Sequence, residues 1–201
     1  MHLTFSSVKK EKQTTQFLPF KQYLFPFLFC CSSFFVHAQV SINEIFAGGS
    51  FELQNTGTET IDISSYYICT FPTYTQLSDL TVECGSLTLN PDETVVISDF
   101  SSFMSNDGEL GLYATNNFGS AEAIVAYVEW GSSAHQRASV AIEAGLWTAD
   151  NAASAFSNTE SLLYDGEGNQ ATDWSVHTDP SICPMISEPA PVEMSLSLIH
   201  I

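Results

Sequence analysis

Short runs in which apolar and polar residues alternate mark the middle of the chain. Residues 40–45 (VSINEI) form one such run, and residues 51–54 (FELQ) form another after Gly48 and Gly49. A period of two places successive side chains on opposite faces of an extended strand. These two runs therefore predict half-buried antiparallel strands.

Similar short runs continue along the chain and are separated by turn residues. Their positions are 61–63, 66–71, 87–89, 95–97, 110–113, 124–130 and 161–164. No long segment has the 3.6-residue period of an amphipathic helix. The alanine-rich segment 139–156 is the one place for helix, but Gly145 and Trp147 favour a loop or a short helical turn. Many short strands at this spacing predict an all-β sandwich or barrel.

The N-terminal segment has the pattern of an export signal. Four lysines lie between residues 9 and 21, and a mostly apolar run at 23–36 follows them. This run is too short to span a bilayer comfortably, and the small Ala38 fits a cleavage site before Gln39. We expect residues 1–38 to be a cleaved signal peptide, with an uncleaved membrane anchor as the alternative. The mature protein is then secreted or held at the cell surface.

Charge is distributed very unevenly along the chain. Beyond residue 38 there are 22 carboxylates and one fixed cation, Arg137, so this part carries a net charge of −21. Such a surface lacks the lysines and arginines that neutralise phosphates. This charge therefore disfavours nucleic acid and anionic membranes as partners. The length of 201 residues suits one domain with processing segments.

Three cysteines, Cys69, Cys84 and Cys183, lie in the part expected to be exported. An oxidising compartment favours their pairing. We predict a disulfide between Cys69 and Cys84, which would close a loop of about 15 residues and stabilise the fold by roughly 3 kcal/mol. Cys183 would then bond within a larger protein or stay free, or it would displace one of the other two. A zinc site is disfavoured, because no C-x-x-C is present and neither His135 nor His177 has a ligand at metal spacing.

The first three of these runs also resemble a known family. Residues 41–45 (SINEI), 51–55 (FELQN) with Gly57, and 61–66 (IDISSY) are similar to the opening signature of lamin tail domains in secreted bacterial proteins. Tyr66 stands where that family usually has tryptophan, and Asp173-Trp174 resembles its closing strand. The resemblance covers about residues 40–180. It implies an immunoglobulin-like antiparallel β-sandwich that lacks catalytic residues and serves as an accessory or interaction module.

Several residue sets offer chemistry, and each also has a structural explanation. Glu44 and Glu52 could form an acid/base pair, although neighbouring strands of an acidic protein bring carboxylates together by chance. A nucleophile set of Ser64, Ser65, His135 and Asp150 lacks the G-x-S-x-G motif. Residues 127–131 (YVEWG) could form an aromatic platform for sugars, but a buried core strand explains them better. We therefore predict no catalytic residues and no enzyme activity.

A possible calcium loop lies at residues 165–169. Asp165, Glu167 and Asn169 place oxygen ligands at alternate positions, with glycines between them, as a hard cation requires. The bidentate glutamate of an EF-hand is absent, and the preceding apolar residues read as a strand that enters a glycine-rich turn. The turn is the preferred interpretation, and calcium is the only candidate cofactor.

The C-terminal residues change in composition after Cys183. Residues 184–195 form a proline-containing linker, and residues 196–201 (LSLIHI) read as a translated sequencing adapter, with a genuine apolar tail as the alternative. The β-sandwich domain is therefore expected to occupy residues 39–183, as the N-terminal part of a longer protein.

We expect a non-catalytic adhesion or interaction module that meets a protein or polysaccharide at the cell surface. One alternative is an accessory domain of a secreted hydrolase whose catalytic domain lies beyond this sequence. A calcium-dependent carbohydrate-binding module is the other.

Overall fold

A computed structural model describes residues 39–100, 106–178, 180 and 183 of the chain. The predicted signal peptide at 1–38, the linker at 184–195 and the terminal segment 196–201 lie outside the described residues. Within the described ranges, no helix is both long enough and apolar enough to cross a membrane.

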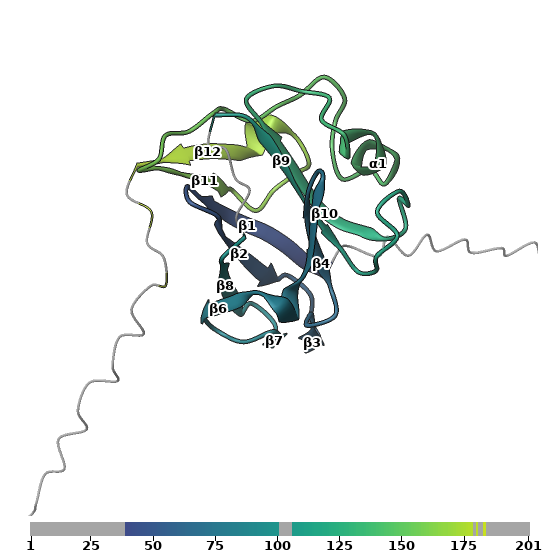
Figure 1. Cartoon of the computed structure of the whole chain (residues 1–201), viewed down its shortest axis with the longest axis vertical. Coiled ribbons are helices and arrows are strands. Elements are labelled where there is room, and N and C mark those ends of the chain that lie inside the picture. Colours follow the sequence, from purple (N-terminus) through teal and green to yellow (C-terminus); the bar gives the residue numbers. More distant parts are fainter. Residues whose placement is uncertain (1–38, 101–105, 179, 181–182, 184–201) are drawn as a thin grey trace, which may run out of the picture. The chain divides into compact units, whose positions relative to one another are not determined.

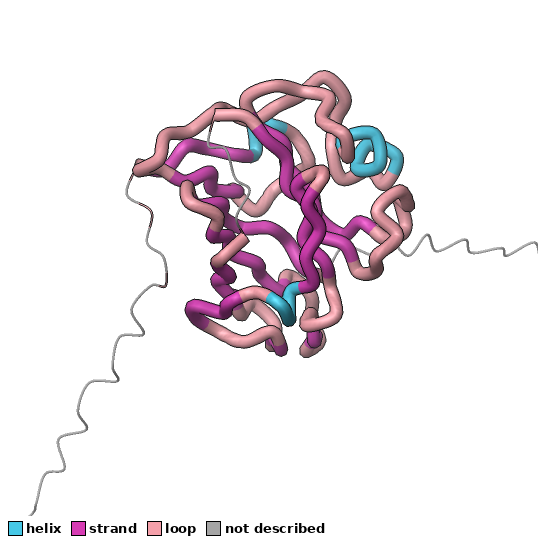
Figure 2. The backbone as a smooth tube through the Cα atoms, viewed as in Figure 1, coloured by secondary structure: helices cyan, strands magenta, loops and turns pink. Residues whose placement is uncertain are grey.

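Two antiparallel sheets form most of the domain (Figures 1 and 2). The larger sheet has six strands, in the spatial order β12 (Trp174–His177), β11 (Ser161–Tyr164), β1 (Val40–Phe46), β2 (Ser50–Asn55), β8 (Thr94–Ser98) and β6 (Thr81–Cys84). The smaller sheet has four, in the order β10 (Ile124–Trp130), β9 (Gly108–Tyr113), β4 (Tyr67–Thr70) and β5 (Thr73–Gln76). The described part of the chain is therefore an all-β, sandwich-like domain, as the sequence predicted.

The remaining elements are short. Strands β3 (Ile61–Asp62) and β7 (Thr88–Leu89) pair with each other. Three helical turns connect strands: η1 (Leu77–Asp79), α1 (Ala138–Glu143) and η2 (Ala171–Asp173). The six residues of α1 lie inside the alanine-rich segment where a short helical turn was predicted.

The core lies between the two sheets and is built from the alternating apolar positions. Ile42, Ile45 and Leu53 project from the six-stranded sheet, and Leu112 and Val128 project from the four-stranded sheet; each is at most 2 % exposed. Complete burial of one such side chain stabilises the fold by about 1.5–3 kcal/mol relative to exposure. The period of two thus places one face of each strand in a common core.

The disulfide differs from the predicted one. Cys84 is bonded to Cys183, with their Cα atoms 5.9 Å apart, and Cys69 is a free, fully buried thiol. The predicted Cys69–Cys84 pairing is therefore wrong. The prediction fails because the two cysteines lie in different sheets. Cys69 lies in β4 of the smaller sheet and faces the core, whereas Cys84 ends β6 of the larger sheet.

This bridge connects opposite edges of the larger sheet. Strands β6 and β12 are its two edge strands, and Cys183 follows the end of β12 at His177 by six residues. The disulfide therefore holds the chain that leaves one edge against the strand at the other edge. A crosslink across a sequence separation of 99 residues restricts the unfolded chain strongly.

Candidate functional site

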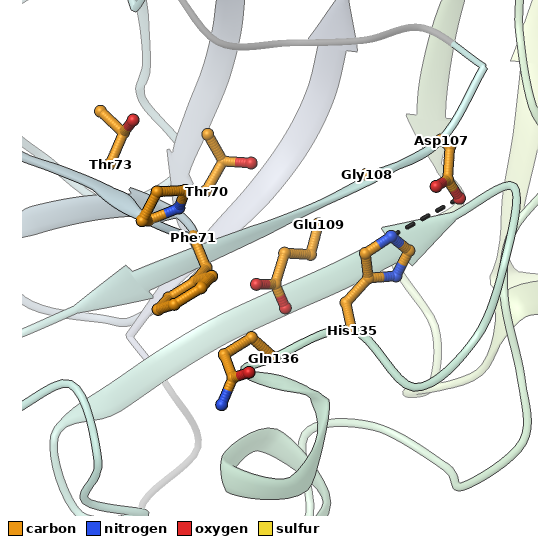
Figure 3. Close-up of a pocket in the computed structure, with 9 residues that line it drawn as sticks. Thr70, Phe71, Thr73, Asp107, Gly108, Glu109, His135 and Gln136 are labelled. Atoms are coloured by element: carbon orange, nitrogen blue, oxygen red, sulfur yellow. Dashed lines mark ion pairs between the residues drawn. The ribbon is translucent and has the colours of Figure 1, made fainter.

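A pocket of about 370 Å³ with several polar side chains lies on the four-stranded sheet (Figure 3). Three segments line it: the connection between β4 and β5, the beginning of β9, and the loop that precedes α1. The lining residues are Thr70, Phe71, Pro72, Thr73, Asp107, Gly108, Glu109, His135 and Gln136.

Two buried carboxylates lie side by side beneath this pocket. Glu109 of β9 and Glu129 of β10 are cross-strand partners, and they are only 3 % and 1 % exposed. Like charges at opposed positions repel each other and destabilise a sheet. The Tyr127 hydroxyl reduces this cost, because it donates to Glu109 Oε2 at 2.9 Å and lies 3.4 Å from Glu129 Oε2.

Glu129 is held by the segment that leads into and beyond α1. Its Oε1 accepts a hydrogen bond from Trp147 Nε1 at 2.9 Å. Its Oε2 accepts one from the His135 backbone N–H at 3.0 Å and lies 3.0 Å from His135 Nδ1. This carboxylate is therefore the anchor on which residues 135–147 fold over β10.

Tyr127 acts as a donor to both carboxylates. Burial raises the pKa of its phenol far above the ordinary value, and the charges of Glu109 and Glu129 raise it further. The phenol therefore keeps its proton and the hydrogen bond it makes. The phenol and the two carboxylates thus form one buried hydrogen-bond network.

Asp107 and His135 form one wall of the pocket. Asp107 Oδ1 accepts hydrogen bonds from the Ser132 hydroxyl at 2.7 Å and the Ser132 N–H at 2.8 Å, and these bonds lower the pKa of Asp107. His135 Nε2 lies 3.5 Å from the same oxygen (Figure 3). Gly131, which precedes Ser132, lets the two chain segments lie this close together. Its φ is +79°, and a Cβ there would lie 2.3 Å from the Asn106 carbonyl oxygen. Asp107 therefore presents an ionised carboxylate to the pocket.

Arg137 supports the opposite wall. Its guanidinium lies 5.5 Å from the centre of the Phe71 ring and 5.4 Å from that of Tyr74, and it donates a hydrogen bond to the Tyr74 hydroxyl. Its backbone N–H donates to Glu109 Oε2 at 2.8 Å. The chain's only arginine thus connects the β4–β5 hairpin to the buried carboxylates.

The neighbouring thiol has no nucleophilic character. Burial, together with the charge of Glu109, raises the pKa of Cys69 to about 12. The thiol is therefore fully protonated at neutral pH, and Cys69 is a core residue.

Glu44 and Glu52 lie together, as the sequence suggested, but away from this pocket. They are cross-strand partners on β1 and β2, and each is 8 % exposed. Glu44 accepts a hydrogen bond from the Ser161 hydroxyl and lies 3.8 Å from His177 Nδ1, while Glu52 accepts one from the Asn43 amide. Both carboxylates thus have local partners on the larger sheet.

We expect Glu52→Gln to stabilise the protein at neutral pH and to have little effect at pH 4. Burial raises the pKa of Glu52 in the folded state, opposed by its hydrogen bond from Asn43 and reinforced by the charge of Glu44. A carboxyl with a raised folded pKa binds its proton more tightly when folded, so its ionisation destabilises the fold as pH rises through that pKa. Urea unfolding at pH 4 and pH 7 tests this. Equal effects at both pH values would contradict the expectation, and Glu83→Gln on exposed β6 is the control.

The nucleophile set is not assembled. Ser64 and Ser65 lie in the turn that follows β3, Asp150 is exposed beyond α1, and His135 lines the pocket. No hydrogen bond among the described residues joins either serine to His135 or Asp150.

The aromatic strand belongs to the core. Tyr127 is 5 % exposed and Trp130 is fully buried, so neither offers a ring to a sugar. The preferred interpretation of residues 127–130 as a core strand is confirmed.

The residues of the possible calcium loop form an exposed turn between β11 and η2. Asp165 Oδ1 accepts a hydrogen bond from the Glu167 N–H at 2.9 Å, and the Asn169 amide donates to the Gly145 carbonyl at 2.8 Å. Asp165 and Asn169 are thus engaged by different segments. Among the described residues, no group of three or more His, Cys, Asp or Glu side chains is placed to hold a metal ion.

Local sequence patterns did not predict Glu109, Glu129 and Arg137 as site residues. One signal was available: Glu129 interrupts the otherwise apolar end of the strand at 124–130, and a carboxylate at such a position requires buried donors. Those donors come from His135 before α1 and from Trp147 beyond it, so their identity depends on the tertiary fold.

Comparisons of this chain with protein-family models, with curated proteins and with solved structures found no match. A function for this chain therefore has to be inferred from the residues of the pocket and their geometry.

Proposed function

We propose that this domain is a non-catalytic interaction module of an exported protein and that the pocket beside Phe71 is its binding site. The observation that carries the proposal is the internal pairing of the buried carboxylates. The Tyr127 hydroxyl, the Trp147 indole and two backbone N–H groups hold Glu109 and Glu129 in place. These groups give the pocket a fixed, charged wall rather than a proton donor and acceptor for a reaction.

Phe71 supplies the contact surface of such a module. It is 47 % exposed at the mouth of the pocket, although most large apolar side chains of the described residues are buried. Its position is fixed by the Arg137 guanidinium and by an edge-on contact with Tyr74, with ring centres 6.5 Å apart. A rigid exposed aromatic ring beside polar groups is a common feature of binding sites.

Export and family type are part of the same proposal. A disulfide is compatible with an extracellular location, and the strongly acidic composition suits a secreted or surface-exposed protein. The resemblance of residues 41–66 to lamin tail domains supports an immunoglobulin-like module. Its first two segments form the paired strands β1 and β2.

We expect the chain to bind a ligand in a way that depends on Phe71. The purified chain is passed over immobilised polysaccharides, basic polypeptides and acidic polypeptides, and retention is measured for the wild type and for Phe71→Ala. We expect at least one ligand class to retain the wild type, with about tenfold or greater weakening in the variant, because truncation of a central aromatic contact commonly costs more than 1 kcal/mol.

Ile142→Ala is the matched control for this test. Ile142 is 38 % exposed on α1 and does not line the pocket, so its truncation should leave retention unchanged. Retention that does not respond to Phe71→Ala would contradict the proposal. Turnover of a retained polysaccharide or polypeptide, lost in Glu129→Gln, would show that the site is catalytic instead.

A further inference from the structure

We infer that the pocket binds the basic side chain of a partner polypeptide, a lysine or an arginine. This inference rests on the proposed function and names its ligand. It follows from the chemistry of the pocket wall, from one oxygen of Glu109, and from the position of the pocket at a sheet edge.

Glu109 directs one carboxylate oxygen toward the pocket. Both hydrogen bonds that the described residues donate to this side chain, from Tyr127 and Arg137, end on Oε2, and none ends on Oε1. The residue is 97 % removed from solvent yet lines the pocket, and its carboxylate lies between Phe71, Gln136 and His135 (Figure 3). Oε1 therefore receives no hydrogen bond from the described residues, so a donor group that enters the pocket gains a charge-assisted hydrogen bond to it.

Charge favours a cation over a neutral donor. Asp107 adds a second carboxylate to the same pocket, and its pKa is lowered by the hydrogen bonds from Ser132, so it is ionised at neutral pH. Arg137, the one fixed cation beyond residue 38, directs its guanidinium to the rings of Phe71 and Tyr74 and to the Tyr74 hydroxyl. The net charge of −21 beyond residue 38 also attracts cationic partners over a distance of about 10 Å at moderate salt.

The shape of the pocket suits a long basic side chain. Its volume of about 370 Å³ lies at the small end of ligand pockets, and the exposed ring of Phe71 can cover the aliphatic part of such a side chain. The hydroxyl of Thr70 and the amide oxygen of Gln136 supply further acceptors at the wall.

The position of the pocket beside an edge strand favours a polypeptide as the ligand. Thr73, which lines the pocket, begins β5, and β5 is the edge strand of the smaller sheet, paired with β4 alone among the described strands. An extended partner segment can lie along such an edge while it places one side chain in the pocket.

Two blocked peptides that differ in one residue test this inference. Acetyl-Gly-Lys-Gly-amide and acetyl-Gly-Gln-Gly-amide are titrated into the purified chain, and binding is followed by NMR chemical shifts. We expect the lysine peptide to bind at least about tenfold more tightly. Glu109→Gln should remove about tenfold of that affinity, as the loss of a charge-assisted hydrogen bond predicts.

Glu143→Gln distinguishes binding in the pocket from general attraction of a cationic peptide to the acidic surface. Glu143 is exposed on α1 and does not line the pocket, so the same charge change there should alter affinity by less than about twofold. Equal weakening by both variants would overturn the inference. If Glu109→Gln fails to fold, Asp107→Asn provides the same test, since its side chain is 43 % exposed and an asparagine oxygen can still accept from Ser132.

The remaining outcomes distinguish this inference from the proposed function. If Phe71-dependent binding is found for a neutral sugar and not for the lysine peptide, the inference fails while the proposed interaction module stands. If no ligand binds in a Phe71-dependent way, both fail. n-Butylamine carries the same cation without a backbone, and binding as tight as that of the lysine peptide would contradict the role of the strand edge.

Discussion

Replacement of Glu129 by alanine is expected to lower the free energy of unfolding by about 2–4 kcal/mol. The substitution removes the acceptor of the His135 backbone N–H and the shorter of the two hydrogen bonds of the Trp147 indole, which keeps the Asn151 carbonyl at 3.2 Å, and it leaves the Tyr127 hydroxyl with Glu109 as its acceptor. Buried donors that lose their acceptor each cost about 1–3 kcal/mol. Chemical denaturation followed by tryptophan fluorescence measures the loss, and Trp147 also reports whether the loop beyond α1 has separated from β10.

Two further variants define the origin of this effect. Glu129→Gln keeps one acceptor oxygen and the side-chain volume, so it should lose less stability than Glu129→Ala. Glu143→Ala, an exposed glutamate on α1, should change stability by no more than about 0.5 kcal/mol. A loss below about 1 kcal/mol for Glu129→Ala would show that the carboxylate is not the anchor of residues 135–147.

Removal of the disulfide is expected to have an effect of similar size. Cys84→Ser and Cys183→Ser should each destabilise the protein by about 2–5 kcal/mol, because the bridge closes a loop with a sequence separation of 99 residues. The double variant should be no less stable than either single variant, since each substitution already breaks the same bond. Unfolding curves in the absence and presence of reductant measure the loss, and reductant should bring the wild type to the level of the variants.

Cys69→Ala is the matched control for the pairing. Its thiol is free and buried in β4, so the substitution should cost about 1 kcal/mol as a small cavity and should leave the sensitivity to reductant intact. Thiol labelling under denaturing, non-reducing conditions should modify Cys69 and leave Cys84 and Cys183 unmodified. Labelling of Cys183 with protection of Cys69 would contradict the structure and restore the pairing predicted from the sequence.

Local sequence patterns determined most of the strands. The strands at β1, β2, β8, β10 and β11 were predicted within two residues, because β1 and β2 carry an alternation of apolar and polar side chains and the other three contain short apolar runs. Strands β5 and β6 were not predicted. Both are edge strands with little buried surface, so Thr73–Gln76 and Thr81–Cys84 need no such alternation and show none that is distinctive.

The sequence by itself determined that the chain forms β-strands, which side chains enter the core, and that the part beyond residue 38 is strongly acidic. These properties depend on residue type and on spacing over a few positions. The tertiary structure alone decided which cysteines pair and which carboxylates meet. Cys84 ends β6 and Cys183 follows β12, so a bond between residues 99 positions apart depends on the arrangement of the whole larger sheet, and Glu109 meets Glu129 through the register of β9 on β10. The same packing places Phe71, Asp107 and His135, which are far apart in the chain, around one pocket.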